Sequence, residues 1–343
     1  MDIFVLILAY LGVAIAFGLA FTNGFQDAAT TAATIVASRS ATPRQAIVLI
    51  SVMNGIGAIV GGSAVAFTIA ELVRGSDGTA TVVIMLSAMT GAVAWNLITW
   101  YYGIPSSSTY ALIGGIIGAG IAVAGVGSIS WGTSEFINAF QLVGVTKVVI
   151  FLIVSILFGL IGGYLVYKLS KILLRNAKRS INRTLQRTQW VAASIFALAN
   201  GANDSQKQMG MIALIILSTG MTTTLDIPVW VRLGVAAAIA FGTLAGGWRV
   251  MRTVGSHLFE IKPIHSVDSQ IVSGAAILIS TFEGAPISST QVVSTSILGI
   301  GAADNAKKVR WSKGIELLST WTITLPAVAL IAGTVAFILS QLV

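Results

Sequence analysis

The chain has 343 residues, of which 55% are hydrophobic and 9% are charged, and its mean hydropathy is +0.90. Since a soluble domain has roughly 25% charged residues, this composition excludes an ordinary soluble protein and indicates a chain that lies in a bilayer. The absence of cysteine excludes disulfide bonds and thiolate metal sites, and the presence of only two histidines argues against a catalytic metal centre.

The apolar residues fall into ten stretches that can each cross a membrane as a helix, which takes about 20 residues. Five stretches precede a basic central region and five follow it. We therefore predict an all-α polytopic membrane protein made of two halves. In chain order, the stretches comprise residues 3–21, 45–70, 80–101, 108–125, 142–167, 189–218, 228–248, 269–283, 288–303 and 315–341.

The first polar interruption follows the first apolar stretch, at residues 23–27, which read Asn-Gly-Phe-Gln-Asp. Glycine tolerates positive φ and asparagine can bond freed backbone groups, so Asn23 and Gly24 predict a broken helix. A carboxylate at membrane depth is costly unless it is paired or solvated, so Asp27 indicates a functional site. Such a break can offer carbonyl oxygens to a cation and N–H groups to an anion, and Gln26 lies inside it.

A second polar sequence, Pro-Ser-Ser-Ser-Thr, occupies residues 105–109, between the third and fourth stretches. Proline favours the first turn of a helix, so the hydroxyl groups that follow Pro105 are expected at a helix N-terminus, either in a spanning pair of helices or in a re-entrant hairpin. A helix N-terminus binds anions, and hydroxyl groups add neutral donors. Simple N-capping explains a single motif of this kind equally well.

Residues 168–188 are the only long polar stretch, and we predict that they connect the two halves, as an amphipathic helix on anionic headgroups. Sixteen of the twenty Lys and Arg residues lie here or in three shorter places, at residues 39–44, 249–262 and 307–313. All four places lie on one side if ten segments alternate, and the positive-inside bias makes this side cytoplasmic. Both termini are then extracytoplasmic, and the net charge of +8 reflects orientation rather than nucleic-acid binding.

Both polar sequences recur in the second half. Residues 200–204 read Asn-Gly-Ala-Asn-Asp and residues 286–290 read Pro-Ile-Ser-Ser-Thr, and their starts lie 86 residues apart, against 82 in the first half. Because each half has an odd number of segments, the second half enters the membrane from the opposite side, which predicts inverted repeats and alternating access. We place the first repeat at residues 1–167, the connection at 168–188 and the second repeat at 189–343.

Two charged residues have no counterpart in the other half. Lys207 stands one turn after Asp204, where the first half has Thr30. We expect Lys207 to neutralise Asp204 and to help hold an anion. Glu283, just before the second hydroxyl motif, is either a further cation or proton site or an exposed carboxylate at a helix end.

The polar residues divide into two candidate sites. Amide and carboxylate oxygens are hard ligands, which suit Na⁺ or a proton rather than a transition metal, and hydroxyl groups suit a tetrahedral oxyanion. The candidate cation ligands are Asn23, Asp27, Asn200, Asn203, Asp204 and Glu283, with Na⁺ expected at Asn23, Asp27, Asn200 and Asp204. The candidate anion ligands are Gln26, Ser107, Ser108, Thr109, Lys207, Ser288, Ser289 and Thr290.

Other functions for these residues are less well supported. Buried Asn and Asp can simply hold helices together, but the same pattern at matching positions of two halves favours a shared site. An intramembrane aspartyl protease also needs two aspartates in helices, yet neither Asp27 nor Asp204 has the Gly-x-Gly-Asp sequence of those enzymes. The chain has no Gly-x-x-x-x-Gly-Lys-Ser/Thr motif, so we predict a transporter driven by an ion gradient rather than an enzyme that uses a nucleotide.

These motifs resemble those of the PiT family of inorganic phosphate transporters, which includes the sodium–phosphate symporters. The family's duplicated Gly-Ala-Asn-Asp signature is similar to residues 201–204 and, more loosely, to residues 24–27. Its Pro-x-Ser-Ser-Thr elements resemble residues 105–109 and 286–290, and the likeness covers nearly the whole chain.

The chain departs from common family patterns at three positions. Histidine or asparagine often stands at the position of Gln26, and histidine is frequent at those of Tyr110 and Gln291. The loss of these imidazole groups disfavours a histidine proton relay and favours Na⁺ over H⁺ as the coupling ion.

The resemblance implies a cell-membrane symporter that imports phosphate with Na⁺, or alternatively with H⁺, and that forms a homodimer. By this resemblance, Na⁺ would bind at Asn23, Asp27, Asn200 and Asp204. Phosphate would bind at the Ser and Thr residues 107–109 and 288–290, with Gln26 and Lys207 nearby. No other cofactor is implied. Two alternatives stay open from the residues alone: transport of another tetrahedral oxyanion, such as sulfate or molybdate, and a passive channel in which the aspartates act as a selectivity element.

Overall fold

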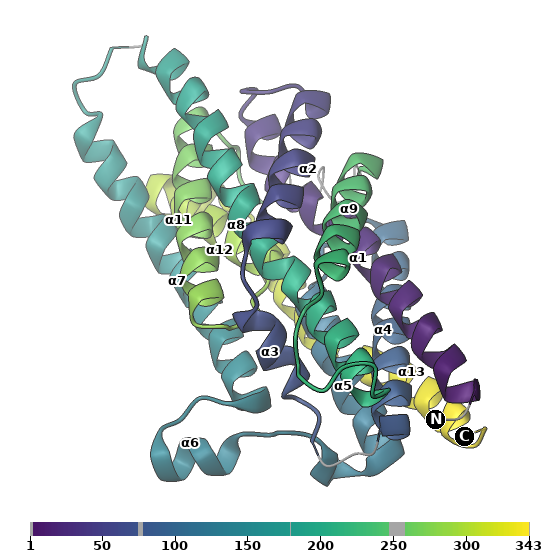
Figure 1. The fold of residues 1–343 in the computed structure, drawn as a ribbon. Coiled ribbons are helices and arrows are strands. Elements are labelled where there is room, and N and C mark those ends of the chain that lie inside the picture. The colour runs from purple at the N-terminus through teal and green to yellow at the C-terminus, as the bar shows by residue number, and fades with distance from the viewer. Residues whose placement is uncertain (1–2, 75–77, 179, 247–257, 343) are drawn as a thin grey trace.

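The computed structural model describes residues 3–74, 78–178, 180–246 and 258–342, which form twelve α-helices and two short 3₁₀ helices, η1 (Val126–Ser128) and η2 (Ala306–Lys308). The α-helices are α1 (Ile3–Ala37), α2 (Pro43–Val60), α3 (Ala64–Ala70), α4 (Gly78–Tyr102), α5 (Ser108–Ala124), α6 (Thr133–Ala139), α7 (Gly144–Leu173), α8 (Ile181–Ser218), α9 (Val229–Ala245), α11 (Pro263–Phe282), α12 (Ser289–Asn305) and α13 (Trp311–Ser340). The long helices lie side by side in one bundle, with both termini at one end and the α7–α8 connection at the other (Figure 1).

The lengths and composition of the helices confirm the predicted all-α, multi-pass membrane protein. Among the described residues, α1, α2, α4, α7 and α13 are long and apolar enough to cross a bilayer, and α5 and α9 are shorter apolar helices. α7 continues to Leu173 and α8 begins at Ile181, so most of the basic stretch 168–188 belongs to these two long helices rather than to a separate one.

The two Asn-Gly sequences do not break their helices, so that prediction is wrong. α1 runs through Asn23 as a helix of 35 residues, and α8 runs through Asn200 as a helix of 38 residues. Glycine instead permits close helix contact: a Cβ on Gly24 would lie 2.4 Å from the Ile239 carbonyl oxygen in α9, and a Cβ on Gly201 would lie 2.1 Å from a carbonyl oxygen of α2. Because both helices are continuous, the side chains, rather than freed backbone groups, are available as ligands.

A break does occur inside the second predicted stretch, where residues 61–63 separate α2 from α3. Gly62 has φ +80°, a left-handed conformation that glycine adopts without strain. Gln206 in α8 bridges the gap, because its side-chain nitrogen donates to the Gly61 carbonyl at 2.6 Å and its oxygen accepts from the Val65 amide at 2.8 Å. Two of the backbone groups that the break exposes are thus satisfied inside the protein, where a bilayer supplies no partner.

The two hydroxyl motifs adopt the same local structure at the starts of α5 and α12. Ser107 precedes α5 with φ −107° and ψ 115°, and Ser288 precedes α12 with φ −105° and ψ 113°. Each hydroxyl accepts a hydrogen bond from the backbone amide three residues later, which is the geometry of an N-cap. The helix N-termini expected at both motifs are therefore present.

The two halves of the chain interlock. α1 of the first half packs against α9 of the second, and α8 of the second half packs against α2 of the first. The last helices are exchanged in the same manner, because α7 packs on α12 and α13 packs on α5. This exchange brings the polar sequences of both halves to one place in the bundle.

We expect Gly24→Ala to destabilise the protein by about 1–3 kcal/mol, because the added methyl group overlaps the backbone of α9. Gly18→Ala in the same helix is the matched control, since a Cβ there meets nothing within 4 Å. Thermal unfolding of the two variants in detergent checks this, and equal unfolding midpoints would contradict the close α1–α9 contact.

Candidate functional site

Asp27 joins the hydroxyl motifs of both halves. Its carboxylate accepts a hydrogen bond from Ser108 Oγ at 2.9 Å and another from Thr290 Oγ1 at 3.2 Å. Thr290 Oγ1 also lies 3.4 Å from Thr30 Oγ1, one turn further along α1. Asp27 is only 3% exposed, so these donors and the nearby charges, rather than bulk water, stabilise its carboxylate. One residue of α1 thus contacts the first turns of α5 and α12.

Lys207 makes the corresponding connection from α8. Its ammonium group donates to Asp204 Oδ1 at 2.6 Å, to Thr109 Oγ1 at 2.7 Å and to the Ile287 carbonyl oxygen at 2.9 Å. The side chain is fully buried, and these three bonds use all the donors of an ammonium group. The ion pair with Asp204 that the spacing predicts is therefore formed, and it ties α8 to both hydroxyl motifs.

Gln26 and Asn203 each bond to the segment that leads into the hydroxyl-bearing helix of their own half, α5 or α12. Gln26 Nε2 donates to Ser106 Oγ at 2.5 Å. Asn203 Nδ2 donates to the Ala285 carbonyl at 3.1 Å, and its Oδ1 accepts from the Ile287 amide at 3.3 Å. The residues that differ between the two copies of the Asp motif thus have the same task, which is to position the hydroxyl groups.

Several buried polar atoms in this region have no hydrogen-bond partner among the described residues. They are Gln26 Oε1, Asn200 Oδ1, Ser289 Oγ and both polar side-chain atoms of Gln291. An unsatisfied buried polar group costs about 1–3 kcal/mol, so their number beside two carboxylates indicates a site for a polar ligand. Gln291 is absent from the predicted ligands, although its position directly after the second hydroxyl motif points to it.

Two of the predicted cation ligands make no hydrogen bond to the residues of this cluster. Asn23 Oδ1 accepts a hydrogen bond from Asn96 Nδ2 at 2.8 Å, so it fastens α1 to α4. Glu283 is an exposed C-cap at the end of α11 and makes none of the contacts described above, which agrees with the alternative of a helix-end carboxylate. Asn96 belongs to neither duplicated motif, so the sequence did not identify it as the partner of Asn23.

The charges in the cluster favour a bound cation. Asp27, Asp204 and Lys207 together carry one net negative charge when all three are ionised, and all are buried. An interior of low dielectric makes such a charge costly, and one small cation among the oxygen atoms would neutralise it. An anion that approaches the hydroxyl groups meets the same carboxylates, which repel it.

Comparison with known proteins gives a consistent result. A family model described as "Phosphate transporter family" matches residues 23–188 and 174–332. A probable low-affinity inorganic phosphate transporter of Bacillus subtilis is 38% identical over 100% of both chains. One of Mycobacterium tuberculosis is 38% identical over 91% of this chain and 73% of its own length. A solved structure titled "The sodium-dependent phosphate transporter" has a TM-score of 0.87 at 22% identity, and covers 98% of this chain and 100% of its own.

We expect Lys207→Met to destabilise the protein by about 3–5 kcal/mol, because it leaves Asp204 buried without its partner. The double variant Asp204→Asn with Lys207→Met should recover part of this loss. Lys313→Met is the matched control, since it removes an exposed pair with Glu316 at the same sequence spacing, a type worth about 0–1 kcal/mol. Thermal unfolding measures all three, and a Lys207→Met variant as stable as the control would refute the buried ion pair.

Proposed function

This chain belongs to the phosphate transporter family, and we propose that it imports inorganic phosphate by symport with Na⁺ through alternating access. Its role is transport and not enzymatic catalysis. Curated relatives that align with its full length are named inorganic phosphate transporters, which supports phosphate as the substrate. The name of the solved relative, a sodium-dependent phosphate transporter, supports Na⁺ rather than H⁺.

One observation carries the mechanism: the groups suited to hold phosphate are engaged by the groups suited to hold the cation. Ser108 and Thr290 donate to Asp27, and Thr109 contacts Lys207, which pairs with Asp204. A Na⁺ ion on either carboxylate competes with these bonds and frees hydroxyl and ammonium donors for an anion. Cation and phosphate binding therefore promote each other, which is a coupling free energy between two sites.

We assign Na⁺ to two places, one in each half of the chain. The first comprises Asn23 and Asp27 in α1, and the second comprises Asn200 and Asp204 in α8, with the unpartnered Asn200 oxygen as a ready ligand. Carboxylate and amide oxygens suit a hard cation of this kind. Glu283 is left out of this proposal because it is exposed at a helix end.

We assign phosphate to the first turns of α5 and α12. The donors are the hydroxyl groups of the two motifs together with Lys207 and the amide groups of Gln26 and Gln291. Helix N-termini supply further N–H donors, so a tetrahedral anion can be surrounded from both halves. The phosphate ligands in the motifs are Ser107, Ser108, Thr109, Ser288, Ser289 and Thr290.

Alternating access is proposed from the duplication of the chain. The reciprocal contacts of Gly24 with α9 and of Gly201 with α2, and the matching caps at Ser107 and Ser288, support two equivalent units that can exchange packing arrangements. We propose that these units are inverted, with both termini extracytoplasmic and the basic loops cytoplasmic, as the positive-inside bias favours. The homodimer implied by the family resemblance stays a prediction.

Uptake of labelled phosphate into proteoliposomes tests this proposal. We expect an inward Na⁺ gradient to drive accumulation above equilibrium, whereas an equal K⁺ gradient does not, and we expect unlabelled sulfate to compete poorly. Flux that is independent of the gradient would indicate a channel. Accumulation driven by a proton gradient alone would show that H⁺, and not Na⁺, is the coupling ion. Strong competition by sulfate would contradict phosphate as the specific substrate.

Asp27→Asn should lower Na⁺-driven uptake at low phosphate by roughly 5- to 150-fold, the range of a typical coupling free energy between sites, because the amide no longer attracts the cation. Asp226→Asn is the matched control, since Asp226 is exposed in the loop between α8 and α9. If the Asp27→Asn variant takes up phosphate as fast as this control, Asp27 has a structural role and does not bind the coupling ion.

A further inference from the structure

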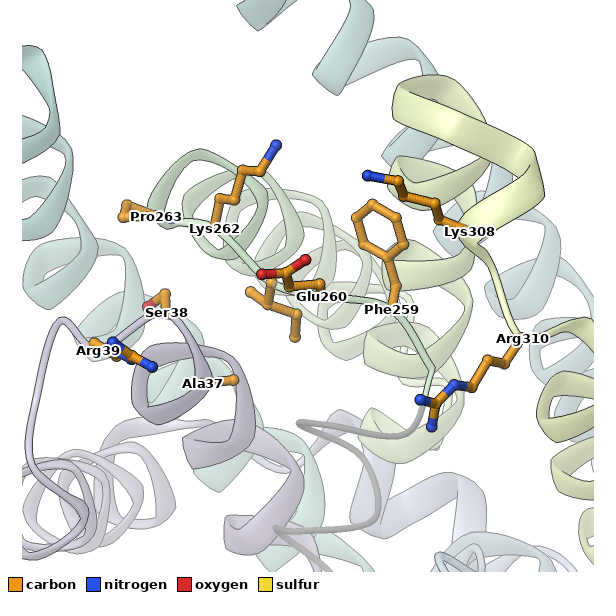
Figure 2. Close-up of a pocket in the computed structure, with 10 residues that line it drawn as sticks. Ala37, Ser38, Arg39, Phe259, Glu260, Lys262, Pro263, Lys308 and Arg310 are labelled. Atoms are coloured by element: carbon orange, nitrogen blue, oxygen red, sulfur yellow. The ribbon is translucent and has the colours of Figure 1, made fainter. Parts of the chain in front are cut away.

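A cavity of about 610 Å³ lies away from the Asp27 cluster, at the end of the bundle where α1 ends and α11 and α13 begin. Ligand pockets commonly measure about 300–1,000 Å³, so this cavity can hold a small organic or oligomeric anion and not only a single inorganic ion. Figure 2 shows its lining. The residues are Ala37, Ser38, Arg39, Phe259, Glu260, Ile261, Lys262, Pro263, Lys308 and Arg310.

The lining is strongly basic. Among the described residues of the lining, four side chains are cations, Arg39, Lys262, Lys308 and Arg310, and one, Glu260, is an anion. They come from three parts of the chain: Arg39 follows α1, Lys262 lies beside Glu260 before α11, and Lys308 and Arg310 lie between α12 and α13 (Figure 2). We call them the basic ring.

The charges of the basic ring are largely uncompensated within the described residues. Lys262 lies 3.8 Å from an oxygen of Asp304, and its side chain is 61% exposed, so this pair is weak. No ion pair or side-chain hydrogen bond between described residues engages Arg39, Lys308 or Arg310. Three cations that line the cavity therefore have no charged partner among the described residues.

Membrane orientation alone does not explain why these cations gather at a cavity. The positive-inside bias accounts for an excess of Lys and Arg on one side, but it does not gather them around a concavity. Lys307 and Lys313 belong to the same basic stretch and do not line the cavity. Phe259 and Ile261 are buried and supply apolar walls, and a few charged groups on apolar walls are typical of a ligand site.

We propose that this cavity binds an anion with more than one phosphate group, either a soluble polyphosphate or the headgroup of an anionic lipid. Arginine binds phosphate in bidentate fashion and lysine binds it as a point charge, and four cations exceed what one phosphate group needs. The occupant bridges the α1–α2 loop, the segment before α11 and the start of α13. Its binding therefore stabilises the folded protein, by an amount that grows with the logarithm of the ligand concentration above Kd.

To test a soluble polyphosphate as the ligand, the purified full-length chain in neutral detergent is titrated calorimetrically with tripolyphosphate. We expect saturable binding that weakens by about tenfold or more in the double variant Lys308→Gln with Arg310→Gln, since charge-assisted bonds are lost. The double variant Lys307→Gln with Lys313→Gln changes the net charge equally outside the cavity, and its binding should stay within about twofold of the wild type.

Glu260→Gln supplies a test that misfolding cannot imitate. Removal of the one negative charge in the lining should tighten anion binding severalfold, because the ligand no longer meets a repulsive carboxylate. Weaker binding in this variant would contradict an anion in the cavity.

Nanodiscs distinguish the two sources. If a lipid headgroup is the ligand, the thermal unfolding midpoint should rise in phosphatidylcholine discs that contain cardiolipin, a lipid with two phosphate groups, relative to discs of phosphatidylcholine alone. This rise should vanish in Lys308→Gln with Arg310→Gln. If a soluble polyphosphate is the ligand, tripolyphosphate should produce the rise in phosphatidylcholine discs. The absence of both effects, or equal losses in the control double variant, would overturn the proposal.

Discussion

The arrangement of the whole bundle depends on the need to satisfy charge inside a bilayer. Asp27, Asp204 and Lys207 lie in the middle of long helices, where water cannot solvate them. Their partners must therefore come from the protein, and they come from both halves: Thr290 donates to Asp27, and Thr109 accepts from Lys207. Each charged helix is thereby held to the hydroxyl motif of the other half.

This requirement accounts for the close packing of the two polar helices. Donors and carboxylates meet only if α1 and α8 approach their neighbours closely, and the backbones of α9 and α2 touch them at Gly24 and Gly201. The continuity of α1 has a second consequence. The helix runs without interruption from Asp27 to Ala37, so the proposed cation site and the basic cavity lie on one rigid element. A movement of α1 would therefore displace residues of both the proposed cation site and the basic cavity.

The two copies of the site are alike in geometry and unequal in charge. The caps at Ser107 and Ser288 have nearly the same backbone conformation, and Gln26 and Asn203 each anchor a loop. Only the second copy has a lysine beside its aspartate. At the proposed cation positions, an ion at Asp204 would compete with Lys207, whereas one at Asp27 would compete only with neutral donors, so the two positions should differ in affinity.

Local patterns in the sequence determined the all-α membrane class, the duplication and the residues of the Asp and hydroxyl motifs, because hydropathy and helix N-terminal signals act within a few turns. Only the tertiary structure decided what the motifs do. Asn-Gly predicts a break when its helix is considered alone, yet neighbouring backbones use the glycine for contact and keep the helix whole. The bonds from Thr290 to Asp27 and from Gln206 to the α2–α3 break join distant residues, and the cations of the basic cavity come from three separate stretches of the chain. No local sequence pattern predicts such contacts between distant residues, since they depend on how the helices pack.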